Sequence, residues 1–139
     1  PTKIEFSRRG LAEGTLLEPV DPEVIRAYRL SPLLVSHYNI QAAFAQKVDA
    51  LAHRAETQGR DVFDLKVLRD AGALREALPR GMRAVLDQAC RNAMAIRFED
   101  FKSQVAAFLT PEFQEFYASA SAWKTLQEAV AQKLRELVP

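Results

Sequence analysis

Most residues that build metal centres and covalent catalytic sites are scarce in this chain. Its 139 residues contain one cysteine and two histidines. A single cysteine excludes a disulfide framework, and neither His37 nor His53 has another histidine or a cysteine at ligand spacing, so no zinc site is expected. No apolar run approaches the roughly 18 residues that a membrane span needs, and no signal-peptide pattern opens the chain. We therefore expect no membrane association.

A charge excess of either sign is also missing. Nineteen basic residues against eighteen acidic ones leave a formal charge of +1, which is no overall signature of nucleic-acid binding. With 48% hydrophobic residues the chain can bury a core without metals or cross-links. Cys90 has apolar and alanine neighbours at helical spacing, which predicts a buried structural thiol in a reducing, cytoplasmic setting.

The first part of the chain has a weak β pattern. Residues 3–7 alternate as a strand does, and the next strand-like stretch is "LLVSHY", residues 33–38. Between them, prolines indicate loop with short extended pieces, and one helical turn is expected from Pro22 to Tyr28. The strands either form a small sheet among themselves or are the trailing edge of a sheet whose other strands lie upstream in a longer protein.

From Asn39 onward the pattern is helical. Asn39 is a suitable N-cap for a first helix that runs to about Glu56, and a second helix is expected from Asp61 to Gly72. Further helical stretches are expected at 73–78, 81–94 and 99–109, then from Thr110–Pro111, and a last helix around 123–137. Four aromatic residues near the end have core-like spacing and are interpreted as packing residues: Phe113, Phe116, Tyr117 and Trp123.

These patterns predict a mainly α fold, a helical bundle with a small incomplete β element at its N-terminal end. We expect a single domain over 1–139, with 1–38 as a strand and loop segment that continues an upstream sheet and 39–139 as the bundle.

The charges in "KVDALAHRAETQGRDVFDLKVL", residues 47–68, do not follow the solvent face. At about 100° per residue, Lys47 falls about 20° from Ile40, inside the apolar stripe of the first helix, and Arg54 lies beside it. Two cations on an apolar face are costly to bury unless an anion meets them. Snorkelling of the side chains, an internal salt bridge and a functional site all remain open.

The second helix shows the same anomaly with the opposite sign. Asp61 and Asp64 point into its apolar arc. Taken singly, Asp61 as N-cap with Asp64 in the first turn resembles a capping box. Taken with Lys47 and Arg54, they predict either a buried ion-pair network or half of a polar site for phosphate and metal.

The run K-x-x-A-x-x-x-R followed by R-D-x-x-D-L carries a family resemblance. It is similar to the downstream motifs of AbiEii-type nucleotidyltransferases, the toxins of bacterial abortive-infection and type IV toxin–antitoxin systems, and "KIEFSRR" resembles the strand that precedes them. The resemblance covers roughly residues 3–70. The positions that carry it are Lys47, Ala50, Arg54, Arg60, Asp61, Asp64 and Leu65.

The resemblance implies nucleotidyl transfer. Lys47 would contact the triphosphate, and Asp64, or in second place Asp61, would orient that lysine, bind the acceptor or assist deprotonation of a hydroxyl. Arg54 and Arg60 would be supporting nucleotide-binding residues. In such enzymes the metal lies on a D-x-D pair after a glycine-serine turn, and that motif does not occur in these residues.

Mg²⁺ and a nucleoside triphosphate are therefore expected in the full-length protein, and none is expected to be bound by this chain alone. The implied function is that of the C-terminal helical domain of an AbiEii-like toxin, inactive alone, which adds a lysine and an aspartate to a cleft completed by an N-terminal half. The implied partners are that upstream half, an antitoxin protein and an RNA acceptor. The alternative is a non-catalytic helical module that binds a protein partner such as an antitoxin.

Overall fold

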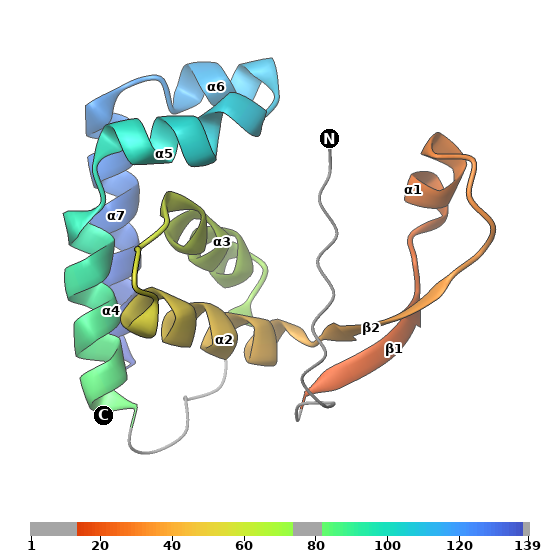
Figure 1. Ribbon diagram of the computed structural model, residues 1–139, viewed down its shortest axis with the longest axis horizontal. Helices are drawn as coiled ribbons and strands as arrows, with labels where there is room; N and C mark the ends of the chain where they lie inside the picture. Colours follow the sequence, from red (N-terminus) through yellow and green to blue (C-terminus); the bar gives the residue numbers. More distant parts are fainter. Residues whose placement is uncertain (1–13, 74–81, 138–139) are drawn as a thin grey trace.

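The computed structural model describes residues 14–73 and 82–137. Figure 1 shows a helical body, made by α2 to α7, and an arm made by β1, α1 and β2 that projects from it. This arrangement confirms the mainly α fold with a small β element. The elements in chain order are β1 (Thr15–Pro19), α1 (Pro22–Ala27), β2 (Leu34–Tyr38), α2 (Ile40–His53), α3 (Gly59–Asp70), α4 (Arg83–Ala95), α5 (Phe98–Gln104), η2 (Ala106–Phe108), α6 (Pro111–Phe116) and α7 (Ala120–Glu136).

The arm is a two-stranded antiparallel sheet with α1 at its far end. Thr15 pairs with Tyr38 and Pro19 with Leu34. The helical turn after Asp21 and the strand in "LLVSHY" are confirmed as α1 and β2, whereas β1 lies in the stretch expected to be mainly loop. The expected strand at 3–7, and the expected helical stretch at 73–78 apart from Ala73, lie outside the described residues.

The arm has no buried residue between positions 14 and 38. Partners that face each other across an antiparallel pair share one side of the sheet, so Leu17, Pro19 and Leu34 lie on the same side. The side chains of Leu17 and Leu34 are 65% and 66% exposed. An isolated two-stranded sheet is marginal at best in water, so this apolar side is a candidate contact surface.

The first two helices of the body carry the candidate site. Asn39 caps α2 as predicted, because its side chain accepts a hydrogen bond from the Ala42 backbone N–H at 2.8 Å. Helix α2 ends at His53 rather than near Glu56. Helix α3 begins at Gly59, and its N-cap position is occupied by Gln58, so the interpretation of Asp61 as an N-cap was wrong.

The early start of α3 has a tertiary cause. The Gly59 backbone N–H donates to the Gln104 side chain of α5 at 2.7 Å. A distant side chain therefore satisfies one of the free N–H groups at the beginning of the helix, and the first turn does not need Asp61 as its cap. Asp61 becomes the third helical residue and turns towards the core.

The core lies between α2, α4 and α7, with α5 closing one end. The ring of Trp123 in α7 stacks on Phe101 of α5 with centroids 4.2 Å apart, and its indole N–H donates to the Ile96 carbonyl at 3.1 Å. Cys90 is buried, as predicted, and its thiol donates to the Ala131 carbonyl at 3.5 Å. Burial raises the pKa of that thiol above its ordinary value.

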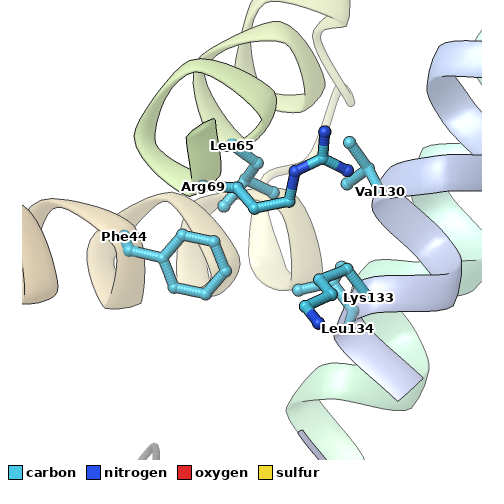
Figure 2. Close-up of a pocket in the computed structure, with 6 residues that line it drawn as sticks. All are labelled: Phe44, Leu65, Arg69, Val130, Lys133 and Leu134. Atoms are coloured by element: carbon cyan, nitrogen blue, oxygen red, sulfur yellow. The ribbon is translucent and has the colours of Figure 1, made fainter. Parts of the chain in front are cut away.

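Figure 2 shows where α2, α3 and α7 meet. The space between the side chains of these three helices is about 10 Å³, enough for roughly one water molecule. The helices that carry the candidate site are thus closely packed on the rest of the body. The residues around this space are Phe44, Leu65, Arg69, Val130, Lys133 and Leu134.

The aromatic residues near the end of the chain divide into two groups. Trp123 and Tyr117 are buried, which confirms their interpretation as core residues, but Phe113 and Phe116 are exposed, so that interpretation was wrong for them. They belong to α6, a short helix at the periphery of the body (Figure 1), and the buried Tyr117 is the residue at its C-terminal end. Within the described ranges, no helix has both the length and the apolar character that crossing a membrane requires.

Candidate functional site

Four of the five predicted site residues meet where α2 passes into α3. Lys47 projects from the third turn of α2, and Arg54 is the residue that ends this helix. Asp61 and Asp64 come from the first half of α3. The two helices pack against each other and are joined by a short loop, so the cations of one helix and the carboxylates of the other reach one place.

Asp61 is the buried centre of this cluster. Its side chain has 0% exposure, and its two carboxylate oxygens face different cations. Lys47 Nζ lies 3.4 Å from Oδ1, and Arg54 Nε lies 3.5 Å from Oδ2. Because a buried carboxylate without opposite charge is strongly unfavourable, the two cations are what makes its burial tolerable.

One oxygen of Asp61 is incompletely satisfied. Among the described residues none donates a hydrogen bond to Oδ2, because Arg54 Nε lies at the outer limit of hydrogen-bond distance. Arg54 thus stabilises Asp61 by charge more than by a hydrogen bond. Lys47 has the better geometry and donates to Oδ1.

Asp64 continues the cluster to the surface. Lys47 Nζ lies 2.6 Å from Asp64 Oδ2, with the lysine side chain 25% exposed and the aspartate side chain 40% exposed. This contact confirms the expectation that Lys47 and Asp64 face the same side and come together. Lys47 therefore bridges a fully buried carboxylate and a half-exposed one, and the internal ion-pair network predicted from the sequence is present.

Arg60 does not join the cluster. It is exposed on the second residue of α3 and forms no hydrogen bond or ion pair with the residues that the structure describes. It stands one helical turn before Asp64, a spacing that places both side chains on the same surface of the helix.

The cluster does not fit a divalent cation. Two carboxylates already face two cations, so their charges sum to zero, and a metal would have to displace Lys47 or Arg54 from its aspartate. In residues 14–73 and 82–137, no group of three or more histidine, cysteine, aspartate or glutamate side chains is placed to hold a metal. What the cluster offers is an ammonium with three N–H donors, partly used and partly open to solvent.

Two supporting residues were missed in the sequence. Asn92 of α4 donates its side-chain N–H to the Leu51 carbonyl at 2.8 Å, which holds the last turn of α2 just before Arg54. Gln104 of α5 holds the first turn of α3 just before Asp61. Neither has a local signal, because each acts on a helix end that is more than thirty positions away in the chain.

The comparisons with known proteins give one family. A family model described as nucleotidyl transferase AbiEii toxin, type IV TA system, matches residues 1–136. No curated protein and no solved structure matches the chain significantly.

Proposed function

The chain belongs to the AbiEii family of nucleotidyl transferase toxins, and from this membership and the polar cluster we propose that it supplies Lys47 and Asp64 to a nucleotide cleft. The cleft is completed by an N-terminal half that carries the metal-binding carboxylates. Family membership implies use of a nucleotide and a divalent metal and suggests an antitoxin partner. The particular residues, Mg²⁺ as the metal and an RNA acceptor are parts of the proposal.

The observation that carries the proposal is the position of Lys47. Its ammonium is held by Asp61 on the buried side and by Asp64 on the side that is open to solvent. A cation placed in this way is preorganised to meet a triphosphate and to stabilise negative charge that develops during transfer. Because Asp61 is buried, it holds the Lys47 ammonium in this position without a movement of the chain.

The two aspartates have different roles in this proposal. Asp61 has no exposed surface, so it cannot touch a substrate and acts as a positioning residue for Lys47 and Arg54. Asp64 is exposed enough to meet an acceptor hydroxyl, either by binding it or by accepting its proton. Arg60 is free to contact a phosphate, whereas Arg54 is engaged with Asp61 and supports the site indirectly.

The metal-binding half must come from other residues. The described residues do not fit a divalent cation, so no step is assigned to a metal within them. Within the described residues the sheet has two strands, and its exposed apolar side supports packing against another surface, in keeping with residues 1–38 as a segment that joins an upstream domain. The upstream coding sequence tests this directly, since the proposal requires a glycine-serine turn followed by D-x-D before Pro1.

The functional test uses the full-length protein. Lys47→Ala and Asp64→Asn should each abolish growth arrest and transfer of labelled nucleotide in extracts. Lys124→Ala is the matched control, because Lys124 also forms an ion pair with a half-exposed carboxylate, that of Glu128, but on α7. Full toxicity of Lys47→Ala would exclude the catalytic role.

The second candidate function is a non-catalytic helical module that binds a protein partner such as an antitoxin. The neutral charge sum of the cluster favours it, because a network whose charges cancel needs no ligand. In that case Lys47→Ala would lower stability while toxicity and partner binding persist. Because Lys47 pairs with the buried Asp61, Lys47→Ala lowers stability under either function, and the two functions differ in whether toxicity persists.

A further inference from the structure

A second concave surface lies between α3 and α6. We call it the α3–α6 hollow, and its volume is about 350 Å³, which is within the range of small-molecule sites. Seven residues line it: Phe63, Lys66, Val67, Asp70, Leu109, Phe113 and Tyr117.

The walls of the α3–α6 hollow are mainly apolar, and three of the seven lining residues are aromatic. The rings of Phe63 and Tyr117 meet edge to face with centroids 5.7 Å apart, and behind them Tyr117 contacts Phe101 of the core in the same way at 5.9 Å. The Phe113 side chain at the opening is 54% exposed. The exposed ring of Phe113 is suited to stacking on a flat, apolar ligand surface. Tyr117 is 5% exposed and also meets Phe116 edge to face at 4.8 Å, so it forms the buried floor of the hollow.

One rim of the hollow is polar. Lys66 and Asp70 form a hydrogen-bonded ion pair one helical turn apart, and Arg69 contacts the same carboxylate at 2.7 Å. The hydrogen bonds from Lys66 and Arg69 hold the pKa of Asp70 below its ordinary value. The rim therefore offers a donor and a charged acceptor at neutral pH, next to apolar walls.

The hollow and the Lys47–Asp64 pair share helix α3. Val67 lines the hollow and follows Asp64 by three residues, so these two are neighbours on the helix surface, with roughly 5–6 Å between their Cβ atoms. Arg60 stands one turn before Phe63 and Asp64 on that surface. A ligand with an anionic end and a flat aromatic end can thus contact Lys47 and the α3–α6 hollow at the same time.

We propose that the α3–α6 hollow binds the nucleobase of the nucleotide whose phosphates contact Lys47. One flat face of the base stacks on Phe113, above the buried ring of Tyr117, and its edge groups meet Lys66 and Asp70. This inference rests on the proposed function, but it adds a site that the family motifs do not contain. It makes Phe113, a residue outside those motifs, a determinant of nucleotide affinity.

The first measurement tests binding of the base in the absence of phosphates, with a nucleoside as the ligand. The chain has three tyrosines, of which Tyr28 and Tyr38 belong to the arm, so the ring resonances of Tyr117 can be followed by NMR with internal controls. Titration with a nucleoside should shift the Tyr117 signals and leave Tyr28 and Tyr38 unchanged. The shift should persist in Lys47→Ala and be lost in Phe113→Ala.

The second measurement separates base from phosphate. By calorimetry on the full-length protein, a nucleoside triphosphate should bind about tenfold more tightly than inorganic tripolyphosphate, since stacking of one base on an aromatic residue accounts for a factor of that size. Phe113→Ala should remove this preference while leaving tripolyphosphate affinity unchanged, and Lys47→Ala should weaken both ligands. Phe108→Ala is the matched control, because Phe108 is an exposed phenylalanine that does not line the hollow, whereas Phe116 contacts the Tyr117 ring.

The outcomes of these measurements distinguish a failure of the nucleobase site from a failure of the proposed function. Tripolyphosphate binding that depends on Lys47, with no effect of Phe113→Ala on nucleotide preference or on the Tyr117 shift, would overturn the nucleobase site alone. A nucleoside shift at Tyr117 without any Lys47-dependent phosphate binding would overturn the proposed function and leave the hollow as a separate base site. Equal losses in Phe113→Ala and Phe108→Ala, or no binding of any of these ligands, would overturn the nucleobase site.

Discussion

Asp61 is the residue on which the candidate site depends. It is a fully buried carboxylate whose charge is compensated by Lys47 and Arg54, and removal of one partner of such a group leaves charge without compensation. The two cations are not equivalent, because Lys47 is shared with the half-exposed Asp64, whereas the Arg54 side chain pairs only with Asp61 among the described residues. Stability and function can therefore be separated by single substitutions within this cluster.

Lys47→Ala should lower the free energy of unfolding by about 3 kcal/mol, the lower part of the range for breaking a buried ion pair, since Arg54 remains near Asp61. Urea unfolding of wild type and variant measures the change. In a double-mutant cycle, Lys47→Ala with Asp61→Asn should give a coupling energy above about 1 kcal/mol, and Lys47→Ala with Asp64→Asn one below it. A loss within about 1 kcal/mol for Lys47→Ala would show that water compensates Asp61.

Asp64→Asn should separate function from stability. Because the Asp64 side chain is 40% exposed, the free energy of unfolding should change by less than about 1 kcal/mol. Transfer by the full-length protein should fall by at least about 100-fold, the usual size of a lost general-base contribution. The readouts are a denaturant melt and a labelled-nucleotide assay; retention of activity within a few-fold would remove Asp64 from the proposed machinery.

At the scale of elements, the site depends on how α3 begins. Gly59 is buried against α5, and a Cβ at this position would lie 3.0 Å from the Phe101 Cα and 3.3 Å from its Cβ. Phe101 cannot move easily, because its ring is fully buried and stacked on Trp123. The close approach of these two backbones fixes the direction in which α3 presents Asp61.

Gly59→Ala should therefore destabilise the protein by about 1–3 kcal/mol, although alanine is the better helix former. Arg60→Ala is the matched control on the next residue; it is exposed and should change stability by less than about 0.5 kcal/mol. Thermal unfolding followed by circular dichroism compares the two variants. A higher melting temperature for Gly59→Ala would mean that α3 and α5 have room to separate.

At the scale of the whole molecule, the arm distinguishes this chain from a closed globular domain. Leu17 and Leu34 are both about two-thirds exposed on the same side of the two-stranded sheet. We expect the purified chain to self-associate with rising concentration, and Leu17→Lys with Leu34→Lys to raise the monomer fraction. Sedimentation velocity measures both, with Leu16→Lys and Val35→Lys on the other side of the sheet as control. A monomeric wild type at high concentration would contradict the expectation.

The 139-residue chain alone should show no nucleotidyl transfer. Its sequence lacks the glycine-serine turn followed by D-x-D, and transfer of phosphoryl groups depends chiefly on metal and positioning. Incubation with labelled nucleotides, magnesium and total tRNA should give no labelled product. Robust magnesium-dependent labelling would show that the chain contains a complete site.

Helical periodicity alone determined the main features of the site. The placement of Lys47 in an apolar stripe and of the aspartates in the next one predicted their meeting, which the 2.6 Å contact between Lys47 and Asp64 confirms. Asn39 as a cap, Trp123 and Tyr117 as core residues and Cys90 as a buried thiol were also predictable. These features are local, since cap chemistry and the 3.6-residue period act over one or two helical turns.

Only the tertiary structure decided how the polar residues divide between core and surface. Asp61 is fully buried and Asp64 is not, because Gln104 of α5 lets α3 begin before Asp61 and turns that residue inward. Phe113 and Phe116 are exposed although their spacing suits a core, because α6 lies at the periphery of the body. A sequence pattern marks the apolar side of a helix, but burial depends on which distant segment covers that side, and that is settled by packing alone.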